Sequence, residues 1–422
     1  ISVPGRSGVS NSTTLRPLPV AVLGLGGPVV GLATGGAHNC ALTPVGGVRC
    51  WGANYYGEVG DGTTFDRWSA VPVTGLASGV AAIAAGGSHS CALTAGGAVK
   101  CWGRNDSGQL GDGTTTHRPA PVAVTGLASG VVAIAAGGSH TCALTTAGAV
   151  LCWGGNASGQ LGDGTTTMRL APVALPNLVS GVASIAVGEN HSCAIGAASG
   201  SLSCWGNNAS GQLGDGTTTS RTRPTKVDGV TNGAAVVAPG GLHTCALSRS
   251  GSAYCWGYNA NGQLGDTTTT PRLSPWEIFA LNAGTASLAS GFLHACSLST
   301  VGGVRCWGYG DHGNLGDGFT LQRNYPVDVA GFASRVAEVA AGGNHACALS
   351  AAGGVKCWGQ GASGQVGDST LANRNVPTDV TDLPARTLYL RSGYQFNCAI
   401  TAEGTVRCWG RNTSGQLGDG TN

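Results

Sequence analysis

The stretch Cys101-Trp102-Gly103 is one of eight Cys-Trp-Gly sequences in this chain of 422 residues. Its tryptophan recurs at a step of 51 residues, with a single step of 52, at Trp51, Trp102, Trp153, Trp205, Trp256, Trp307, Trp358 and Trp409. A unit of about fifty residues with several short apolar runs between glycine-rich turns is typical of a propeller blade, because such a sheet buries its faces only against neighbouring copies. The period therefore predicts an all-β chain of eight repeats.

The composition narrows the classes of protein. Glycine supplies 74 residues while apolar residues remain at 42%, which indicates many tight turns rather than disorder. Charged residues are only 10% of the chain and the net charge is +2, so we expect no nucleic-acid partner. The apolar runs are too short for a membrane-spanning helix, so we expect no membrane insertion. We expect one soluble domain over residues 1–422, and a start at Ile1 without methionine fits a processed protein or an excised fragment.

The sixteen cysteines occur as two in each repeat. In the second copy, a hairpin that turns at residues 95–97 places Leu93 opposite Val99 and Cys91 opposite Cys101. Directly opposed cysteines on antiparallel strands are close enough to form a disulfide. We therefore expect eight disulfides and a compartment outside the cytosol. The expected pairs are Cys40 and Cys50, Cys91 and Cys101, Cys142 and Cys152, Cys193 and Cys204, Cys245 and Cys255, Cys296 and Cys306, Cys347 and Cys357, and Cys398 and Cys408.

Zinc is the alternative use of these cysteines. His140, Cys142 and Cys152 offer three ligands in one repeat, and most other copies offer the same set. The eighth copy reads Phe396-Asn397-Cys398, so it keeps both cysteines and loses the histidine. A disulfide tolerates that loss and a metal site does not. The sequence favours disulfides, and we expect no metal and no cofactor.

Four strands are expected in each blade. In the third copy they are residues 130–136, the hairpin 141–145 and 149–153, and residues 120–124 as the strand laid down before them. The run Val-Val-Ala-Ile-Ala-Ala in 131–136 is apolar on both faces, as expected of a sheet sandwiched between two others.

A loop typified by residues 105–114 is expected between blades. Its aspartate is followed six residues later by an arginine, for which we expect an ion pair between blades or a turn cap, since one acidic side chain is too few for calcium. The pairs are Asp61 and Arg67, Asp112 and Arg118, Asp163 and Arg169, Asp215 and Arg221, Asp266 and Arg272, Asp317 and Arg323, and Asp368 and Arg374. Arg16 and Asp419 are the two members left over, one near each terminus. This complementarity predicts a ring closed by the two termini, or alternatively a head-to-tail filament.

Three motifs carry a family resemblance. They are Gly137-Gly-Ser-His140-Thr-Cys-Ala-Leu, Cys152-Trp-Gly and Asn156-x-Ser-Gly-Gln-Leu-Gly-Asp163-Gly. With them the chain resembles the regulator of chromosome condensation repeat family from about residue 12 to the end. The resemblance implies a β-propeller of four-stranded blades. Members are usually seven-bladed, so eight copies is a departure.

The family hosts several activities. The eukaryotic exchange factor uses a protruding insertion that this evenly spaced array lacks. The plant ultraviolet photoreceptor relies on tryptophans in Gly-Trp-Arg-His-Thr, whose counterpart here is Gly137-Gly138-Ser139-His140-Thr141, without tryptophan. Inhibition of a secreted enzyme such as a β-lactamase fits the expected compartment. No nucleophile motif, carboxylate pair of unusual placement or phosphate loop is present, so we expect no enzyme.

Candidate binding residues are those that depart from the repeat consensus, because the consensus builds the scaffold. Exposed aromatic side chains are good anchors for a partner. One group is Tyr55, Tyr56, Phe65 and Trp68, and a second is Trp276, Phe292, Tyr309, His312 and Phe319. The alternative for each is that it fills a gap between blades.

Two further sets recur with the repeat. The histidines are expected to bond a neighbouring blade's backbone, or alternatively to form an axial ring or a protonation switch; they are His38, His89, His140, His191, His243, His294 and His345. Glycosylation sequons at Asn105, Asn156, Asn208, Asn412 and Asn11 suggest turn chemistry first and glycan acceptance second.

These observations lead to two hypotheses of function. The first is a secreted or cell-surface binding module whose loop face engages an extracellular protein or glycan. The second is a structural or filament-forming surface element without a small partner.

Overall fold

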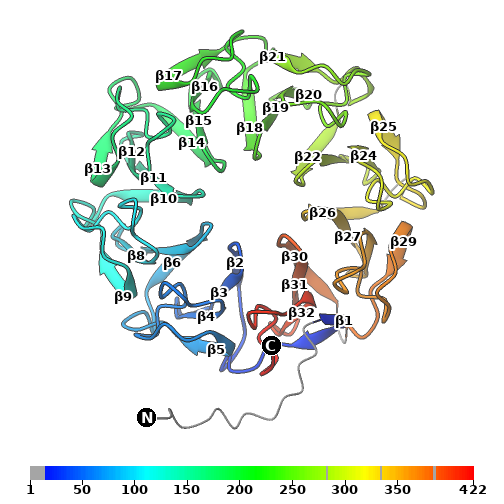
Figure 1. Cartoon of the computed structure of the whole chain (residues 1–422), viewed down its shortest axis with the longest axis horizontal. Helices are drawn as coiled ribbons and strands as arrows, with labels where there is room; N and C mark the ends of the chain where they lie inside the picture. The colour runs from blue at the N-terminus through cyan, green and yellow to red at the C-terminus, as the bar shows by residue number, and fades with distance from the viewer. Residues whose placement is uncertain (1–14, 282–283, 333–334, 384–385) are drawn as a thin grey trace, which may run out of the picture.

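The computed structural model describes residues 15–281, 284–332, 335–383 and 386–422. Within these ranges the strands form eight four-stranded antiparallel sheets, arranged as blades around a central opening (Figure 1). The predicted eight-bladed propeller is confirmed. The described residues contain one helical element, the short 3-10 turn η1 (Phe279–Leu281). No helix among them is long and apolar enough to cross a membrane.

Each blade has an inner strand beside the central opening, two middle strands and an outer strand. We number the blades in chain order from the sheet that holds β2. Their strands are, for blade 1, β2 (Gly31–Thr34), β3 (His38–Leu42), β4 (Val48–Gly52) and β5 (Arg67–Pro72); for blade 2, β6 (Val80–Ala85), β7 (His89–Thr94), β8 (Val99–Gly103) and β9 (Arg118–Ala123); for blade 3, β10 (Val131–Ala136), β11 (His140–Thr145), β12 (Val150–Gly154) and β13 (Arg169–Ala174); for blade 4, β14 (Val182–Val187), β15 (His191–Gly196), β16 (Leu202–Gly206) and β17 (Arg221–Val227); for blade 5, β18 (Ala234–Pro239), β19 (His243–Ser248), β20 (Ala253–Gly257) and β21 (Arg272–Glu277); for blade 6, β22 (Thr285–Ser290), β23 (His294–Ser299), β24 (Val304–Gly308) and β25 (Arg323–Asp328); for blade 7, β26 (Val336–Ala341), β27 (His345–Ser350), β28 (Val355–Gly359) and β29 (Arg374–Asp379); and for blade 8, β30 (Thr387–Ser392), β31 (Phe396–Thr401), β32 (Val406–Arg411) and β1 (Leu15–Ala21).

The expected hairpin register and disulfides are present. In blade 2, Cys91 pairs with Cys101 and Leu93 with Val99. The two α-carbons of this disulfide are 4.1 Å apart, the spacing of a pair without mutual backbone hydrogen bonds. All sixteen cysteines form such within-blade disulfides, which takes them out of consideration as zinc ligands.

The predicted assignment of strands to blades was wrong by one strand. The strand expected at 120–124 is β9, and it pairs with β8 of blade 2 rather than with blade 3. The loop of residues 104–117 therefore lies within a blade, not between blades. The crossing to the next blade is the short connection of residues 124–130, which leads from β9, the outer strand of blade 2, to β10, the inner strand of blade 3.

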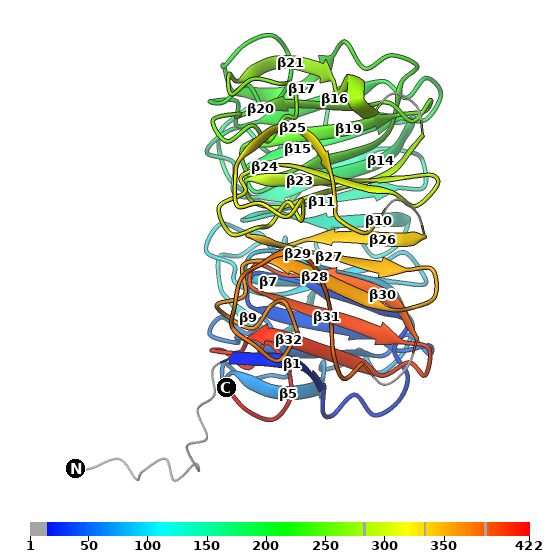
Figure 2. The same ribbon diagram turned by 90° about the vertical axis from the view of Figure 1, so that its right-hand side faces the viewer.

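The ring closes through β1, as predicted. This strand pairs with β32 as the outer strand of blade 8, so one blade contains both ends of the described chain (Figures 1 and 2). Arg16 Nε donates to Asp419 at 2.7 Å, which restores the Asp and Arg pair that the termini divide. Pro17 O also accepts a bond from Ser369 N of blade 7 at 2.9 Å. β1 thus completes blade 8 and also bonds it to blade 7.

The core consists of eight apolar clusters that lie between adjacent blades. The cluster between blades 2 and 3 contains Leu93, Leu110 and Trp153, together with the Cys91–Cys101 disulfide. Each Cys-Trp-Gly tryptophan is fully buried, and its indole nitrogen donates to a loop carbonyl of the preceding blade, as Trp153 does to Gln109 at 2.9 Å. The repeated tryptophan is therefore the link between blades, which explains why a single repeat has no complete core.

Antiparallel pairing gives the ring two different faces. We call loop face the one that carries the turns between inner and second strands and the long loops between third and outer strands. We call turn face the opposite one, with the tight hairpin turns and the connections between blades. Figure 2 shows the strands running between these faces.

Candidate binding face

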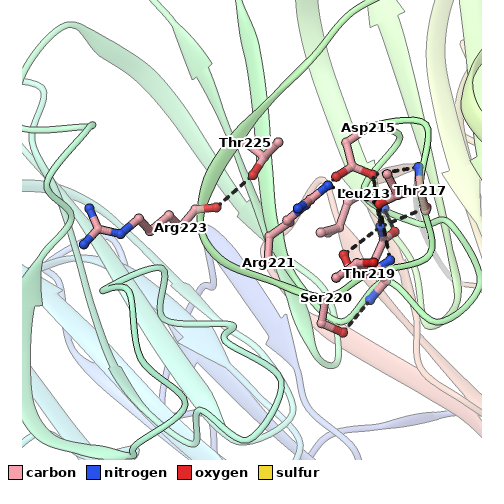
Figure 3. Close-up of polar contacts among 9 residues, drawn as sticks. Leu213, Asp215, Thr217, Thr219, Ser220, Arg221, Arg223 and Thr225 are labelled. Atoms are coloured by element: carbon pink, nitrogen blue, oxygen red, sulfur yellow. Dashed lines mark hydrogen bonds and ion pairs between the residues drawn. The ribbon is translucent and has the colours of Figure 1, made fainter.

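In six blades the long loop of the loop face is built by an Asn–Asp–Arg network, shown for blade 4 in Figure 3, whereas blades 6 and 7 have Gly310 and Gly361 in place of the asparagine. Asn208 Nδ2 donates to Asp215 and to the carbonyls of Thr217 and Thr219, at 3.0–3.1 Å. Asp215 Oδ1 caps the turn by accepting from Thr217 N at 3.1 Å, and its Oδ2 accepts from Arg221 Nε at 2.6 Å. The predicted ion pair and turn cap are both present, but the pair lies within one blade rather than between two.

The Asp215 carboxylate of this network stays ionised to a lower pH than that of a free aspartate. Burial alone would raise the pKa of Asp215, but the hydrogen bonds from Thr217 and Arg221 outweigh it and hold that pKa below its usual value. The same Asp–Arg ion pair occurs in all eight blades. Each long loop is therefore a rigid platform rather than a free segment.

The network also explains the recurring sequons. Asn105, Asn156, Asn208 and Asn412 are buried, and the Nδ2 atom that would carry a glycan donates hydrogen bonds inside the loop. These sequons serve turn chemistry, as expected, and the folded loop leaves no access to their amide nitrogens. The sequon at Asn11 lies outside the described residues.

The seven repeated histidines are buried, and five of them bond a side chain of the neighbouring blade, not its backbone as expected. His89 Nε2 lies 2.8 Å from Thr141 Oγ1, which in turn donates to the Gln109 carbonyl at 3.0 Å. His38, His140 and His191 make the same contact with a serine or threonine, and His345 makes it with Asn397. Burial lowers the pKa of each histidine, to about 4 or about 3, so the rings are neutral at physiological pH.

Two histidine contacts are incomplete, which gives a stability prediction. Ala295 and Ala346 replace the hydroxyl residue, and Nε2 of His243 and of His294 has no hydrogen-bond partner in the described structure. Ala295→Ser should bridge His243 and the Gln263 carbonyl and stabilise the fold by about 1 kcal/mol. We expect a higher melting temperature in thermal denaturation. The matched control is Ala143→Ser, which buries an unpaired hydroxyl in an apolar cluster and should lower the melting temperature. If both variants lower the melting temperature equally, the serine does not bridge His243 and the Gln263 carbonyl.

The first aromatic group lies in the long loop of blade 1. Tyr55 and Phe65 are 76% and 70% exposed, and both neighbour Asn54, whose Nδ2 donates to the Phe65 carbonyl at 3.0 Å. Tyr56 instead packs against blade 2, with its ring centroid 4.8 Å from that of His117 and 5.2 Å from the Arg104 guanidinium.

The remaining member of the first group, Trp68, lies on the other side of blade 1. Its ring covers Gly415 of blade 8. Prolines and leucines of other outer strands occupy the same position over the preceding blade's loop, as Leu170 does over Gly108. Trp68 therefore packs between blades, while Tyr55 and Phe65 are the members free for a partner.

A buried carboxyl group lies beneath the first group and was missed in the sequence. Glu58 stands where six other blades have glutamine and blade 6 has Asn314, and its Oε2 accepts from Tyr56 N at 2.8 Å. Burial raises the pKa of Glu58 to about 7. The signal that could have identified it is the replacement of an otherwise recurring Gln by Glu.

The second aromatic group is not one patch. Tyr309, His312 and Phe319 share the long loop of blade 6, with the Tyr309 and His312 ring centroids 5.8 Å apart. Trp276 lies on the outer strand of blade 5, where the Arg272 guanidinium covers its ring at 4.0 Å. Phe292 lies beside the central opening.

The central opening has residues that the sequence analysis did not single out. A hollow of about 360 Å³ is formed at the loop face by the turns between inner and second strands, and we call it the axial mouth. Phe292 lies 6.0 Å from Tyr394, centroid to centroid, at 86°. Tyr394 and Glu189, like Phe292, occupy a position that is glycine in the other five blades, and this was the available signal.

Comparison with known proteins adds to this geometry. A family model described as the RCC1-like domain matches residues 3–286 and again 129–422. The ultraviolet-B receptor UVR8 of Arabidopsis thaliana is 32% identical over 348 residues, which are 80% of this chain and 78% of that protein. The human E3 ubiquitin-protein ligase HERC2 is 30% identical over 343 residues, 78% of this chain but only 7% of the ligase. The solved structure of Prp20p from Saccharomyces cerevisiae has a TM-score of 0.63 at 21% identity, covers 94% of this chain and 93% of Prp20p, and supports the fold alone.

Proposed function

The chain belongs to the RCC1-like domain family, and from this premise we propose that it is a secreted or cell-surface binding module that engages an extracellular protein or glycan with its loop face. RCC1-like propellers serve as protein-interaction modules; the Prp20p structure, for example, was reported with its binding to Gsp1p and histones. The HERC2 match covers too little of the ligase to support a catalytic role here.

One observation carries this proposal: exposed aromatic side chains stand on a rigid loop. Tyr55 and Phe65 project from a loop fixed by the Asn54 amide and the Asp61–Arg67 ion pair. A partner that covers them meets a surface that loses little conformational entropy on binding. The eight disulfides support the compartment, because such bonds persist in oxidising surroundings.

The test is binding to arrays of purified extracellular proteins and of glycans. We expect Tyr55→Ser with Phe65→Ser to weaken the captured interaction by at least about tenfold, as for aromatic anchors at interface centres. The control is Val45→Ser with Val301→Ser, two equally exposed residues on the turn face. The proposal fails if the intact chain captures nothing, or if the two double variants lose binding equally.

The alternatives to this proposal are an inhibitor of a secreted enzyme and a structural or filament-forming surface element without a small partner. A secreted enzyme inhibited by the propeller would be one protein partner of the loop face. Head-to-tail assembly would require β1 to leave β32, and its signature would be oligomers in sedimentation that disappear when residues 1–16 are removed.

A further inference from the structure

The axial mouth carries one sign of charge. Its lining is mostly glycine and other small residues of the turns, and Glu189, Phe292 and Tyr394 are its large side chains. Among the described residues that line the mouth, Glu189 is the only acidic or basic one. The Glu189 carboxylate would therefore repel an anion in the mouth and attract a cation.

Glycines keep open the space between Glu189 and the rings of Phe292 and Tyr394. Gly241 of blade 5 stands between Glu189 of blade 4 and Phe292 of blade 6, and a side chain on it would meet Glu189 Oε2 at 3.8 Å. Gly343 of blade 7 stands between Phe292 and Tyr394, and its Cβ would lie 3.0 Å from the tyrosine ring. The three larger residues thus form an arc around the mouth, with glycine in every gap.

Backbone bonds hold this arc in place. Phe292 N donates to Gly343 O at 3.3 Å, and Gly343 N donates to Tyr394 O at 2.9 Å. The rings of Phe292 and Tyr394 nevertheless remain 51% and 53% exposed. Ring faces that are fixed in position and open to solvent attract a cation through the aromatic quadrupole.

We propose that the axial mouth binds the lysine or arginine side chain of a protein partner, with Glu189 facing its charge and Phe292 and Tyr394 packing against its stem and head group. This inference deepens the proposed function and rests on it. Leu242, exposed beside Gly241, adds apolar surface for the aliphatic part of such a side chain. A glycan in the mouth is the competing outcome.

The experiment is a selection from a phage library of random 12-residue peptides on the intact chain. We expect enrichment of peptides that contain lysine or arginine. In fluorescence polarisation, the best of them should bind about tenfold more weakly to Glu189→Gln and to Phe292→Ala with Tyr394→Ala. Added salt should weaken binding to the intact chain more than to Glu189→Gln. All three positions are exposed, and an unchanged melting temperature will confirm folding.

The controls separate this inference from the proposed function. Glu403→Gln removes an exposed carboxylate on the turn face and should leave peptide binding unchanged. Tyr55→Ser with Phe65→Ser should also retain it, even if those residues hold another part of the partner. The inference is overturned if no basic peptide is enriched, if Glu189→Gln binds as tightly as the intact chain, or if only glycans occupy the mouth.

Discussion

Acidification from pH 7 towards pH 4 should unfold this propeller cooperatively. Seven histidines are buried and neutral in the folded ring, with pKa values lowered by burial to about 4 or about 3. In the unfolded chain they titrate near their ordinary value of about 6.5. Between these values the unfolded state binds more protons than the folded state.

The sign of the effect follows from that difference. Because the folded pKa is depressed, the stability of the ring is complete above about pH 6.5 and is lost as the pH falls towards the folded values. Seven extra histidine protons in the unfolded state, offset by the one proton that Glu58 binds in the fold because burial raises its pKa to about 7, give a slope of up to roughly 8 kcal/mol per pH unit near the middle of this window. The Asp–Arg pairs of seven blades act in the same direction, since the pKa values of their carboxylates are lowered in the fold; these are Asp61, Asp112, Asp163, Asp215, Asp266, Asp368 and Asp419.

Melting temperatures from pH 7 to pH 4 at constant ionic strength provide the measurement. His140→Phe is the matched variant, because Phe396 already occupies this position in blade 8. It should reduce the proton uptake on acid unfolding by one. A melting temperature that stays level down to pH 4 would show that the buried rings do not govern acid stability.

The sequence predicted the features that recur in every repeat, namely the blade number and the disulfides. It did not predict how the chain passes from one blade to the next. The 51-residue period and the opposed cysteines are local signals, so blade number and disulfides followed directly. No local signal in the sequence showed to which blade β9 belongs. Residues 104–117 return to β8 because Asn105 and Asp112 fold this loop back on itself, and the shorter connection after β9 is the one that crosses.

In the candidate site, too, the sequence identified unusual residues but not the contacts that they make in the folded ring. Tyr55 and Phe65 were predicted because they stand out from a polar loop. Trp68 and Trp276 stand out equally, but their partners, Gly415 and Arg272, come together only in three dimensions. Tyr394 and Glu189 replace glycine at a turn, and their common position around the axis emerges only once the ring has closed.

Removal of the closing strand should have the second large effect. A chain without residues 1–21 loses the pairing of β1 with β32, the Arg16–Asp419 ion pair and the Ser369 N to Pro17 O bond between blades 7 and 8. Several buried backbone hydrogen bonds and a core boundary are lost together, at about 1 kcal/mol or more for each bond. We expect the melting temperature to fall by at least about 10 °C. The exposed edge of β32 should also promote association.

The reference for this experiment is the chain without residues 1–14, which keeps β1 and its contacts. A synthetic peptide of residues 15–21 offers a rescue, since it supplies β1 with Arg16 and Pro17, while the shortened chain keeps Val22 and Leu25 of the core cluster between blades 8 and 1. If ring closure is the cause, the peptide should raise the melting temperature of the shortened chain in proportion to its occupancy and leave the reference unchanged. Equal melting temperatures for the two truncated chains would mean that the contacts between blades hold the ring without its closing strand.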